Sequence, residues 1–277
     1  MSPSPQTARA NGLDIAYLEE GRGPLVLLLH GFPDTPQTWD RTRPALAANG
    51  FRAVSPFLRG YAPTAIPADG DYTADALARD AAALIEALGE TEAIVVGHDW
   101  GASAAYGVAN LFPERVRFLA TIAIPHPASI RPSLGLAWKG RHFFLLRRRG
   151  AADRVRANGF AHVDELVRRW SPAWDVPPDE TRAVKEVFAK PGCLEAALGY
   201  YRAVGLRPSA SQVAPIRMPA VAFAGATDFA FGPAAFERAR PWYRDRYEVV
   251  TLPGGHFLHR EHPERFHEEL LRRLPRA

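Results

Sequence analysis

The sequence contains only one cysteine, Cys193, among its 277 residues. A single cysteine excludes a disulfide within the chain and a metal site built from cysteines. Long apolar runs are also missing, since the longest stretch without a charged residue, 100–113, is shorter than the roughly 18 residues that a transmembrane helix needs. The N-terminus lacks a basic stretch followed by an apolar one, so we expect no secretory signal, no membrane partner and a cytoplasmic location.

Lysine is scarce as well, because only three of the 34 basic residues are lysines and the others are arginines spread along the chain. The formal net charge is +4. A nucleic-acid-binding protein gathers its cations on one face. The one dense run here, 147–149, ends a helix-like segment, where cations suit the negative end of the helix dipole. We therefore expect no nucleic-acid partner.

Apolar residues make up 47% of the chain, which is enough for a sizeable core. Three short apolar runs, each followed closely by glycine, cover 25–29, 93–96 and 220–223. Such runs predict strands buried on both faces, as in a parallel sheet covered by helices. A helix-like stretch over 73–88 ends at Gly89. This alternation predicts an α/β fold with a doubly wound, mostly parallel sheet.

The stretch 131–214 breaks the alternation, and no convincing strand falls inside it. Prolines separate its helix-like segments, because proline ends a helix or starts the next one. We expect four helices there, over 134–149, 163–170, 178–189 and 193–206. The prediction is therefore a sheet domain formed by 1–130 and 215–277, with 131–214 as a helical insertion.

The segment 97–102 reads Gly-His-Asp-Trp-Gly-Ala and lies between a predicted strand and a predicted helix. This is the setting of a nucleophile elbow, with Asp99 in place of the serine of G-x-S-x-G. Gly97 and Gly101 would allow the tight turn. Asp99 could instead be a simple N-cap of the helix, but an N-cap does not need small residues on both sides. His98 precedes the elbow residue, so its side chain should point away from the site.

A second motif, His30-Gly31-Phe32-Pro33, follows the first buried strand. Together the two motifs resemble those of the α/β-hydrolase superfamily. The aspartate narrows the resemblance to epoxide hydrolases and haloalkane dehalogenases, and it extends over essentially the whole chain. The resemblance implies that the helical insertion is a cap, that the backbone N–H groups of Phe32 and Trp100 form an oxyanion hole, and that the peptide bond before Pro33 is cis.

The superfamily order is nucleophile, acid and then histidine. Asp228 follows a predicted strand that ends near residue 224, and His256 follows a probable strand over 248–252. Separately, Asp228 could be a turn residue and His256 a surface histidine. Their order behind Asp99, each just after a strand, favours a catalytic triad.

An aspartate nucleophile suits displacement at a saturated carbon, which leaves an alkyl ester on Asp99. Water activated by His256, with Asp228 orienting the imidazole, would then attack the carboxyl carbon of that ester. This mechanism requires no cofactor and no metal. His259 and His262 have a spacing seen in metal sites, but no partner set accompanies them, so we expect surface residues at the start of a final helix over 263–274.

The leaving group decides between the two branches. Epoxide hydrolases meet the epoxide oxygen with two cap side chains, usually tyrosines, and the resemblance assigns these roles to Tyr201 in 199–202 and to His142, eight residues before Gly150. Most relatives have tyrosine where His142 stands. Both residues could instead be ordinary core, because each has apolar neighbours at helical spacing.

The first hypothesis is therefore an epoxide hydrolase acting on a small hydrophobic substrate and water. The second is a haloalkane or haloacid dehalogenase with the same triad. Trp100 could hold halide, but one dehalogenase type has asparagine where Phe32 stands, and fluoroacetate dehalogenases have arginine at position 100. A non-catalytic ligand-binding protein should have lost a triad member, and none is lost. The sequence leaves a homodimer possible.

Overall fold

The computed structural model describes residues 3–205 and 208–275. Its eight-stranded sheet has the order β1-β2-β4-β3-β5-β6-β7-β8. The strands β1 and β2 pair antiparallel with each other, β2 pairs antiparallel with β4, and all remaining pairs are parallel. The predicted doubly wound, mostly parallel sheet is therefore confirmed. The strands are β1 Gln6–Ala10, β2 Leu13–Glu20, β3 Leu25–Leu29, β4 Arg52–Pro56, β5 Ala93–His98, β6 Val116–Ile122, β7 Ala220–Gly225 and β8 Tyr247–Leu252.

The central strands are buried on both faces, as their continuous apolar runs predict. Every residue of β3, β5 and β7 is buried. Along β3, Leu27 and Leu29 contribute to one core cluster, whereas Val26 and Leu28 contribute to the other, since side chains alternate along a strand. Because helices cover both faces, a functional site is expected at the carboxyl edge of the sheet, where the parallel strands end.

Two pairs of helices line these faces. The first face packs against α2 (Ala74–Ala87) and α3 (Trp100–Leu111), and the second packs against α1 (Thr42–Ala48) and α12 (Pro263–Leu271). The predicted helix over 73–88 is confirmed, with Thr73 as its N-cap. Shorter elements are α10 Pro233–Glu237, α11 Leu258–Glu261 and the 3-10 helices Pro36–Trp39, Pro113–Arg115, Pro127–Ser129 and Arg240–Trp242.

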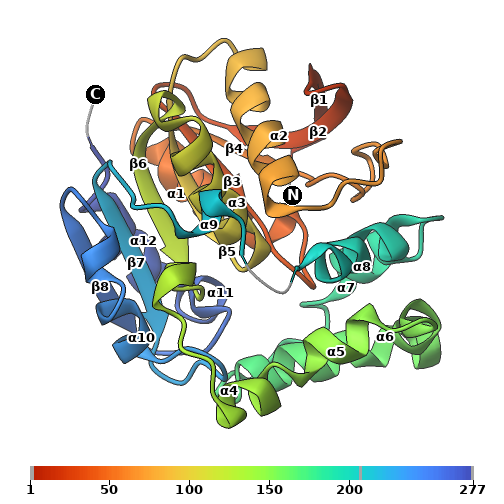
Figure 1. Cartoon of the computed structure of the whole chain (residues 1–277). Coiled ribbons are helices and arrows are strands. Elements are labelled where there is room, and N and C mark those ends of the chain that lie inside the picture. Colours follow the sequence, from red (N-terminus) through yellow and green to blue (C-terminus); the bar gives the residue numbers. More distant parts are fainter. Residues whose placement is uncertain (1–2, 206–207, 276–277) are drawn as a thin grey trace.

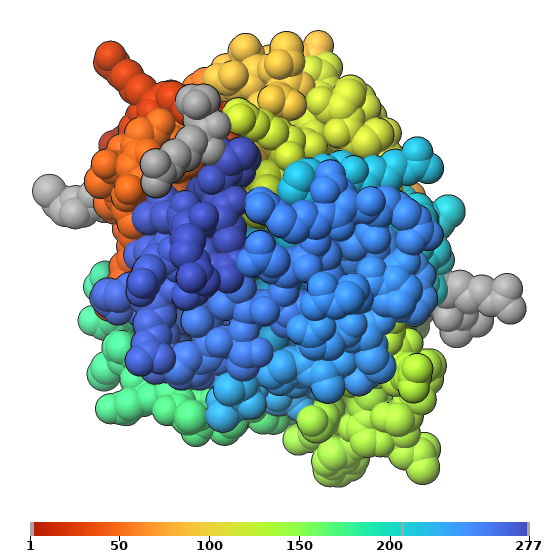
Figure 2. Space-filling model, turned by 90° about the vertical axis from the view of Figure 1, so that its left-hand side faces the viewer, coloured from red at the N-terminus to blue at the C-terminus, as the bar shows by residue number. Residues whose placement is uncertain are grey.

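The chain between β6 and β7 is helical, and its described residues in 131–214 contain no strand. In Figure 1 helices α5 to α8 gather on one side, beyond the end of the sheet. Figure 2 shows C-terminal residues in blue over much of one face, with part of the helical segment in green along its lower edge. The helices are α4 Leu134–Lys139, α5 Arg141–Arg147, α6 Ala151–Trp170, α7 Arg182–Phe188, α8 Cys193–Ala203 and α9 Ala210–Val213.

The helix boundaries in this segment differ from those predicted. Gly140 divides the expected helix 134–149, because it ends α4 and begins α5. Helix α6 starts twelve residues before position 163 and contains non-helical backbone at 157–160. Helix α7 starts only at Arg182. The expected helix 193–206 ends at residue 203, and position 206 lies outside the described residues.

Across the described residues, no helix is both long and apolar enough to span a bilayer.

Candidate active site

Asp99 lies in a tight turn between β5 and α3. Its backbone has φ 53° and ψ −116°, a strained conformation for a non-glycine residue, of the kind that clusters at functional sites. A Cβ atom at Gly97 would overlap the carbonyl oxygen of Gly101, and one at Gly101 would overlap the backbone of Leu29. Both glycines are therefore required sterically, so Asp99 is an elbow residue and not merely an N-cap.

The motif at 30–33 lies directly against this elbow. The backbone N–H of Phe32 donates a 2.9 Å hydrogen bond to Asp99 Oδ1, and a Cβ atom at Gly31 would collide with the Asp99 side chain. The peptide bond between Phe32 and Pro33 is cis, as the resemblance implies. Trp100 starts helix α3, so its N–H belongs to the unpaired first turn, where the helix dipole is positive. These two amides can hold an oxyanion on Asp99.

His30 has a structural position in the same motif. Its Nδ1–H donates to the carbonyl of Gly31 at 2.9 Å, and its Nε2 accepts from the backbone N–H of Leu58 at 3.2 Å. Burial lowers the pKa of His30 to about 4, against smaller opposing effects of the Gly31 hydrogen bond and the Asp99 charge. A neutral His30 therefore connects the 30–33 motif to the loop after β4.

The structure brings Asp99, His256 and Asp228 together in the order that the sequence predicts. His256 Nδ1 lies 3.0 Å from Asp228 Oδ2, and His256 Nε2 lies 3.4 Å from Asp99 Oδ2. Asp228 Oδ1 accepts hydrogen bonds from the backbone N–H groups of Ala230 and Phe231, at 2.6 and 3.0 Å. The carboxylate of Asp228 is therefore fixed on both oxygens, and it holds His256 with Nε2 facing Asp99.

The charge state of His256 depends on both carboxylates. Burial favours its neutral form, but hydrogen bonds and charges from Asp228 and Asp99 outweigh this effect and raise the pKa to about 9. At neutral pH the resting site therefore holds an imidazolium between two carboxylates. Loss of the Asp99 charge would remove one of these contributions and lower the pKa of His256.

His98 and His259 lie next to His256, on the side away from the cavity. His98 Nε2–H donates to the backbone carbonyl of His256 at 3.0 Å, and His98 is absent from the cavity wall, as expected for a side chain that points away. The surface position expected for His259 is wrong: the residue is only 1% exposed and its Nε2 hydrogen-bonds to Thr38 at 2.7 Å. His98 thus fixes the backbone at His256, and His259 connects the segment after it to Thr38.

His98 and His259 also form a buried cluster with Asp34, in which one potential ligand atom from each residue lies within 4.8 Å of the others. Asp34 pairs with the guanidinium of Arg260 at 3.0 Å. A cation there would be repelled by Arg260, whose charge already neutralises this carboxylate. We therefore assign no metal role to this cluster.

A cavity of about 760 Å³ opens over Asp99. Its wall contains Trp100, His142, Tyr200 and His256, together with mostly apolar side chains from the sheet edge and from α4, α5 and α8. A cavity of this size with few polar groups suits a small hydrophobic substrate.

Tyr201 lies next to the cavity, although Tyr200 and not Tyr201 belongs to its wall. The Tyr201 ring packs edge-on against Phe32 and Trp100, with centroid distances of 5.1 and 5.2 Å. Burial and the charge of Asp99 raise the pKa of Tyr201 well above its ordinary value. The phenol therefore stays protonated and can donate. The hydroxyl of Tyr200 donates to the Arg59 carbonyl at 2.8 Å.

His142 lies in the cavity wall, and its ring centroid is 6.0 Å from that of Tyr201. Arg169 donates to His142 Nδ1 at 3.2 Å, which leaves Nε2 as the protonated nitrogen. Burial and the Arg169 charge lower the pKa of His142 to about 4, so the ring is neutral at pH 7. Arg169 was not predicted, because nothing distinguishes it in sequence from the many other arginines.

The comparisons with known proteins agree with this architecture. The family model described as alpha/beta hydrolase fold matches residues 24–263. Epoxide hydrolase 3 of Mus musculus is 30% identical over 271 residues, covering 94% of this chain and 73% of that protein. The crystal structure of an epoxide hydrolase from Vigna radiata superposes with a TM-score of 0.83 at 26% identity, covering 98% of each chain.

A further structure, of an epoxide hydrolase from Bacillus megaterium, has a TM-score of 0.85 at 23% identity and covers 96% of this chain and 99% of that one. At that identity the likeness shows the fold alone. The family match extends over most of the chain, and the mouse relative is similar over most of its own length. The chain therefore belongs to the alpha/beta hydrolase fold family, is a hydrolase, and has epoxide hydrolases among its relatives.

Proposed function

We propose that this hydrolase opens an epoxide to a vicinal diol through a covalent ester on Asp99. The observation that carries the proposal is the position of an imidazole and a phenol at the cavity over Asp99: His142 lies in the cavity wall, and the Tyr201 ring packs against Trp100 with its centroid 6.0 Å from that of His142. Epoxide opening develops negative charge on an oxygen that stays attached to the substrate, and such an oxygen needs donors. The named relatives support the same reaction class.

In the first half-reaction, Asp99 Oδ2 attacks an epoxide carbon and the carbon–oxygen bond of the ring breaks. The hydroxyl of Tyr201 and the Nε2–H of His142 donate hydrogen bonds to the developing alkoxide, which takes a proton from one of these two groups. Asp99 Oδ1 remains hydrogen-bonded to the backbone N–H of Phe32, so Oδ2 is the oxygen that faces His256 and the cavity. The product of this step is a hydroxyalkyl ester of Asp99.

In the second half-reaction, the lost charge of Asp99 lowers the pKa of His256, which therefore releases its proton. That proton replaces the one that the alkoxide took from Tyr201 or His142. His256 then accepts a proton from water, which attacks the carboxyl carbon of Asp99. The N–H groups of Phe32 and Trp100 hold the oxyanion. Collapse of the tetrahedral intermediate breaks the ester bond to the substrate oxygen. That oxygen takes the remaining proton of the added hydroxyl, which releases the diol and restores the carboxylate, with His256 protonated again.

We also propose that 131–214 acts as a cap on the domain formed by 1–130 and 215–277. This segment supplies His142 and Tyr201, and its helices α4, α5 and α8 contribute to the cavity wall. Without them, Asp99 would face solvent at the carboxyl edge of the sheet. The cap therefore contributes both the donors and the apolar enclosure.

A dehalogenase with the same triad is the second candidate. It would need the Trp100 indole N–H to bind halide, but in this structure the Tyr201 ring packs edge-on against the indole, with 5.2 Å between the ring centroids. Assays with styrene oxide and with a panel of brominated alkanes distinguish the candidates. Diol from the epoxide supports the proposal, halide release without diol supports the dehalogenase, and neither product supports a non-catalytic binding protein.

Tyr201→Phe and His142→Phe should each slow alkylation of Asp99 by about 10- to 100-fold, because each removes one of two donors that share the developing charge. The double variant should lose more than either single variant, with effects that do not add. Since the pKa of His142 is about 4, its contribution should be constant between pH 5 and 8. Rapid-quench measurement of adduct formation tests these rates.

Tyr200→Phe is the matched control on the same helix. Tyr200 lines the cavity with its ring, but the hydroxyl that the variant removes donates to the Arg59 carbonyl at 2.8 Å and is not available to the substrate. The variant should therefore lower the free energy of unfolding by ~0.5–1.5 kcal/mol with little change in alkylation. If Tyr201→Phe alkylates as fast as the wild type while Tyr200→Phe is slow, the donor assignment is wrong.

A further inference from the structure

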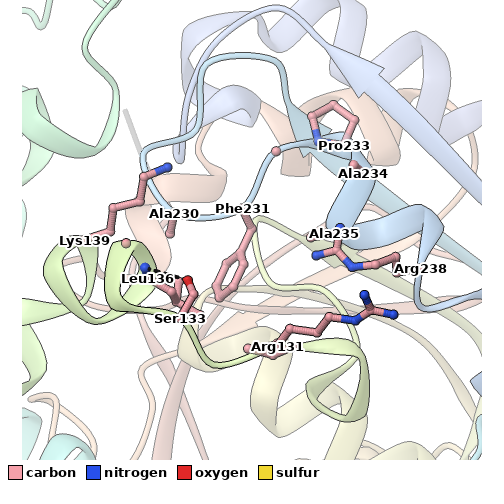
Figure 3. Close-up of a pocket in the computed structure, with 13 residues that line it drawn as sticks. Arg131, Ser133, Leu136, Lys139, Ala230, Phe231, Pro233, Ala234, Ala235 and Arg238 are labelled. Atoms are coloured by element: carbon pink, nitrogen blue, oxygen red, sulfur yellow. Dashed lines mark hydrogen bonds between the residues drawn. The ribbon is translucent and has the colours of Figure 1, made fainter.

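A second cavity, of about 400 Å³, lies beside the main one. The two cavities share a wall formed by five residues, Ile130, Ser133, Leu136, Ala230 and Phe231. Figure 3 shows the second cavity between the start of α4 and the loop before α10, with the Phe231 ring in its centre. Nothing in the proposed reaction uses this space.

Three cations line the second cavity: Arg131, Lys139 and Arg238. All three are exposed, and no described carboxylate lies within ion-pair distance of any of them. The nearby acids are engaged elsewhere, because Glu237 pairs with Arg240 at 2.7 Å and Asp228 holds the catalytic histidine. The cavity therefore carries positive charge that none of the carboxylates in the described residues compensates through an ion pair.

The arrangement of these side chains suits an anion. In Figure 3 the guanidinium groups of Arg131 and Arg238 lie on one side of the cavity, and Lys139 lies on the opposite side. Like charges that face one cavity repel one another, and an anionic group between them would remove the repulsion. Two guanidinium groups are also the donors best suited to a carboxylate, because each can bind it through two N–H groups.

Phe231 links this cavity to the reaction site. Its backbone N–H, like that of Ala230, donates to Asp228 Oδ1, so the loop at the shared wall is held by the proposed catalytic acid. The main cavity is mostly apolar and ends at this wall. A chain-like molecule with its reactive end at Asp99 would therefore pass along apolar side chains before it reached the cations.

We propose that the second cavity is a subsite for a carboxylate carried by the substrate, so that the enzyme prefers amphiphilic epoxides over neutral ones. The hydrocarbon segment would occupy the main cavity with its epoxide beside Asp99. The carboxylate would lie between Arg131 and Arg238, with Lys139 adding charge. This inference rests on the proposed function, since it assigns the substrate class of the same site.

The test compares ω-epoxyalkanoates with ω-epoxyalkanols of equal chain length, over a series of lengths. At the length that spans both cavities, the acid should have the higher kcat/KM, mainly through a lower KM, because the carboxylate contact is made equally in ground and transition states. Arg131→Gln and Arg238→Gln should each reduce the preference about fivefold, and together about 20-fold, as for exposed ion pairs of good geometry. Added salt should weaken the preference.

Arg9→Gln on β1 is the matched control, because it removes the same charge from an exposed arginine that pairs with Asp14, away from both cavities. It should retain the preference. Equal kcat/KM for acids and alcohols at every length, or a preference that the double variant retains, would overturn the subsite.

Failure of the proposed function would look different: neither the acids, the alcohols nor styrene oxide would be hydrolysed. The subsite is then tested by calorimetric titration with alkanoates of the same lengths. Binding by the wild type that the double variant loses would support a carboxylate subsite, and equal or absent binding in both would reject it.

Discussion

Replacement of His256 by glutamine should stop turnover after the first half-reaction and leave the substrate attached to Asp99. Glutamine retains a polar side chain but cannot take a proton from water, so hydrolysis of the ester should slow by about 10²- to 10⁴-fold. Alkylation should continue, because Asp99 and the donors Tyr201 and His142 remain. Intact-protein mass spectrometry after incubation with a turned-over epoxide should show a mass gain equal to one substrate molecule.

A matched control is His162→Gln, which removes a histidine that pairs with Glu165 on α6 and lies outside the cavity wall. This variant should turn over normally and should show no adduct. A His256→Gln enzyme that is inactive but never accumulates an adduct would exclude the covalent route. Normal turnover by the same variant would exclude His256 as the base.

Asp99→Ala should abolish both half-reactions, with a loss of about 10⁴-fold or more. The other described carboxylate of the cavity wall, Asp75, hydrogen-bonds to Ser209 and Ser211, whereas Asp99 lies 3.4 Å from His256. The fold should persist, since the described side-chain contacts of Asp99 are those with Phe32 and His256. The variant also removes one of the charges that raise the pKa of His256, so that pKa should fall below about 9. Product assays, near-ultraviolet circular dichroism and an NMR titration of the histidine ring measure these three effects.

Asp153→Ala controls for loss of an acidic residue, because Asp153 is 87% exposed on α6. Its activity and the titration of His256 should match the wild type. If Asp99→Ala retains diol formation, Asp99 is not the nucleophile. If the pKa of His256 does not change in this variant, Asp99 is not a partner of the imidazolium.

The sequence predicts the sheet and the neighbourhood of Asp99 well because the signals are local. Asp99 and Asp228 each follow a short apolar run that becomes a fully buried strand, and His256 follows β8, which is only partly buried. The carboxyl ends of parallel strands meet at one edge of a sheet, so residues far apart in sequence become neighbours there. The steric need for Gly97 and Gly101 is local in the same way.

Other features depend on contacts that no local pattern encodes. His259 is buried because it bonds to Thr38, which lies 221 residues earlier in the chain. Arg169 and His142 lie on two different helices, and their contact depends on how α5 packs against α6. Helical spacing alone also could not show that Tyr200 lines the cavity while Tyr201 contacts Phe32 and Trp100.

The most direct test of the covalent mechanism is a single turnover in ¹⁸O-labelled water with enzyme in excess over epoxide. If water attacks the carboxyl carbon of Asp99 and not the substrate, as we propose, the diol should be unlabelled and the peptide that contains Asp99 should gain one ¹⁸O atom. A diol labelled in that first turnover, with unlabelled Asp99, would mean that water opens the epoxide directly and would contradict the ester intermediate.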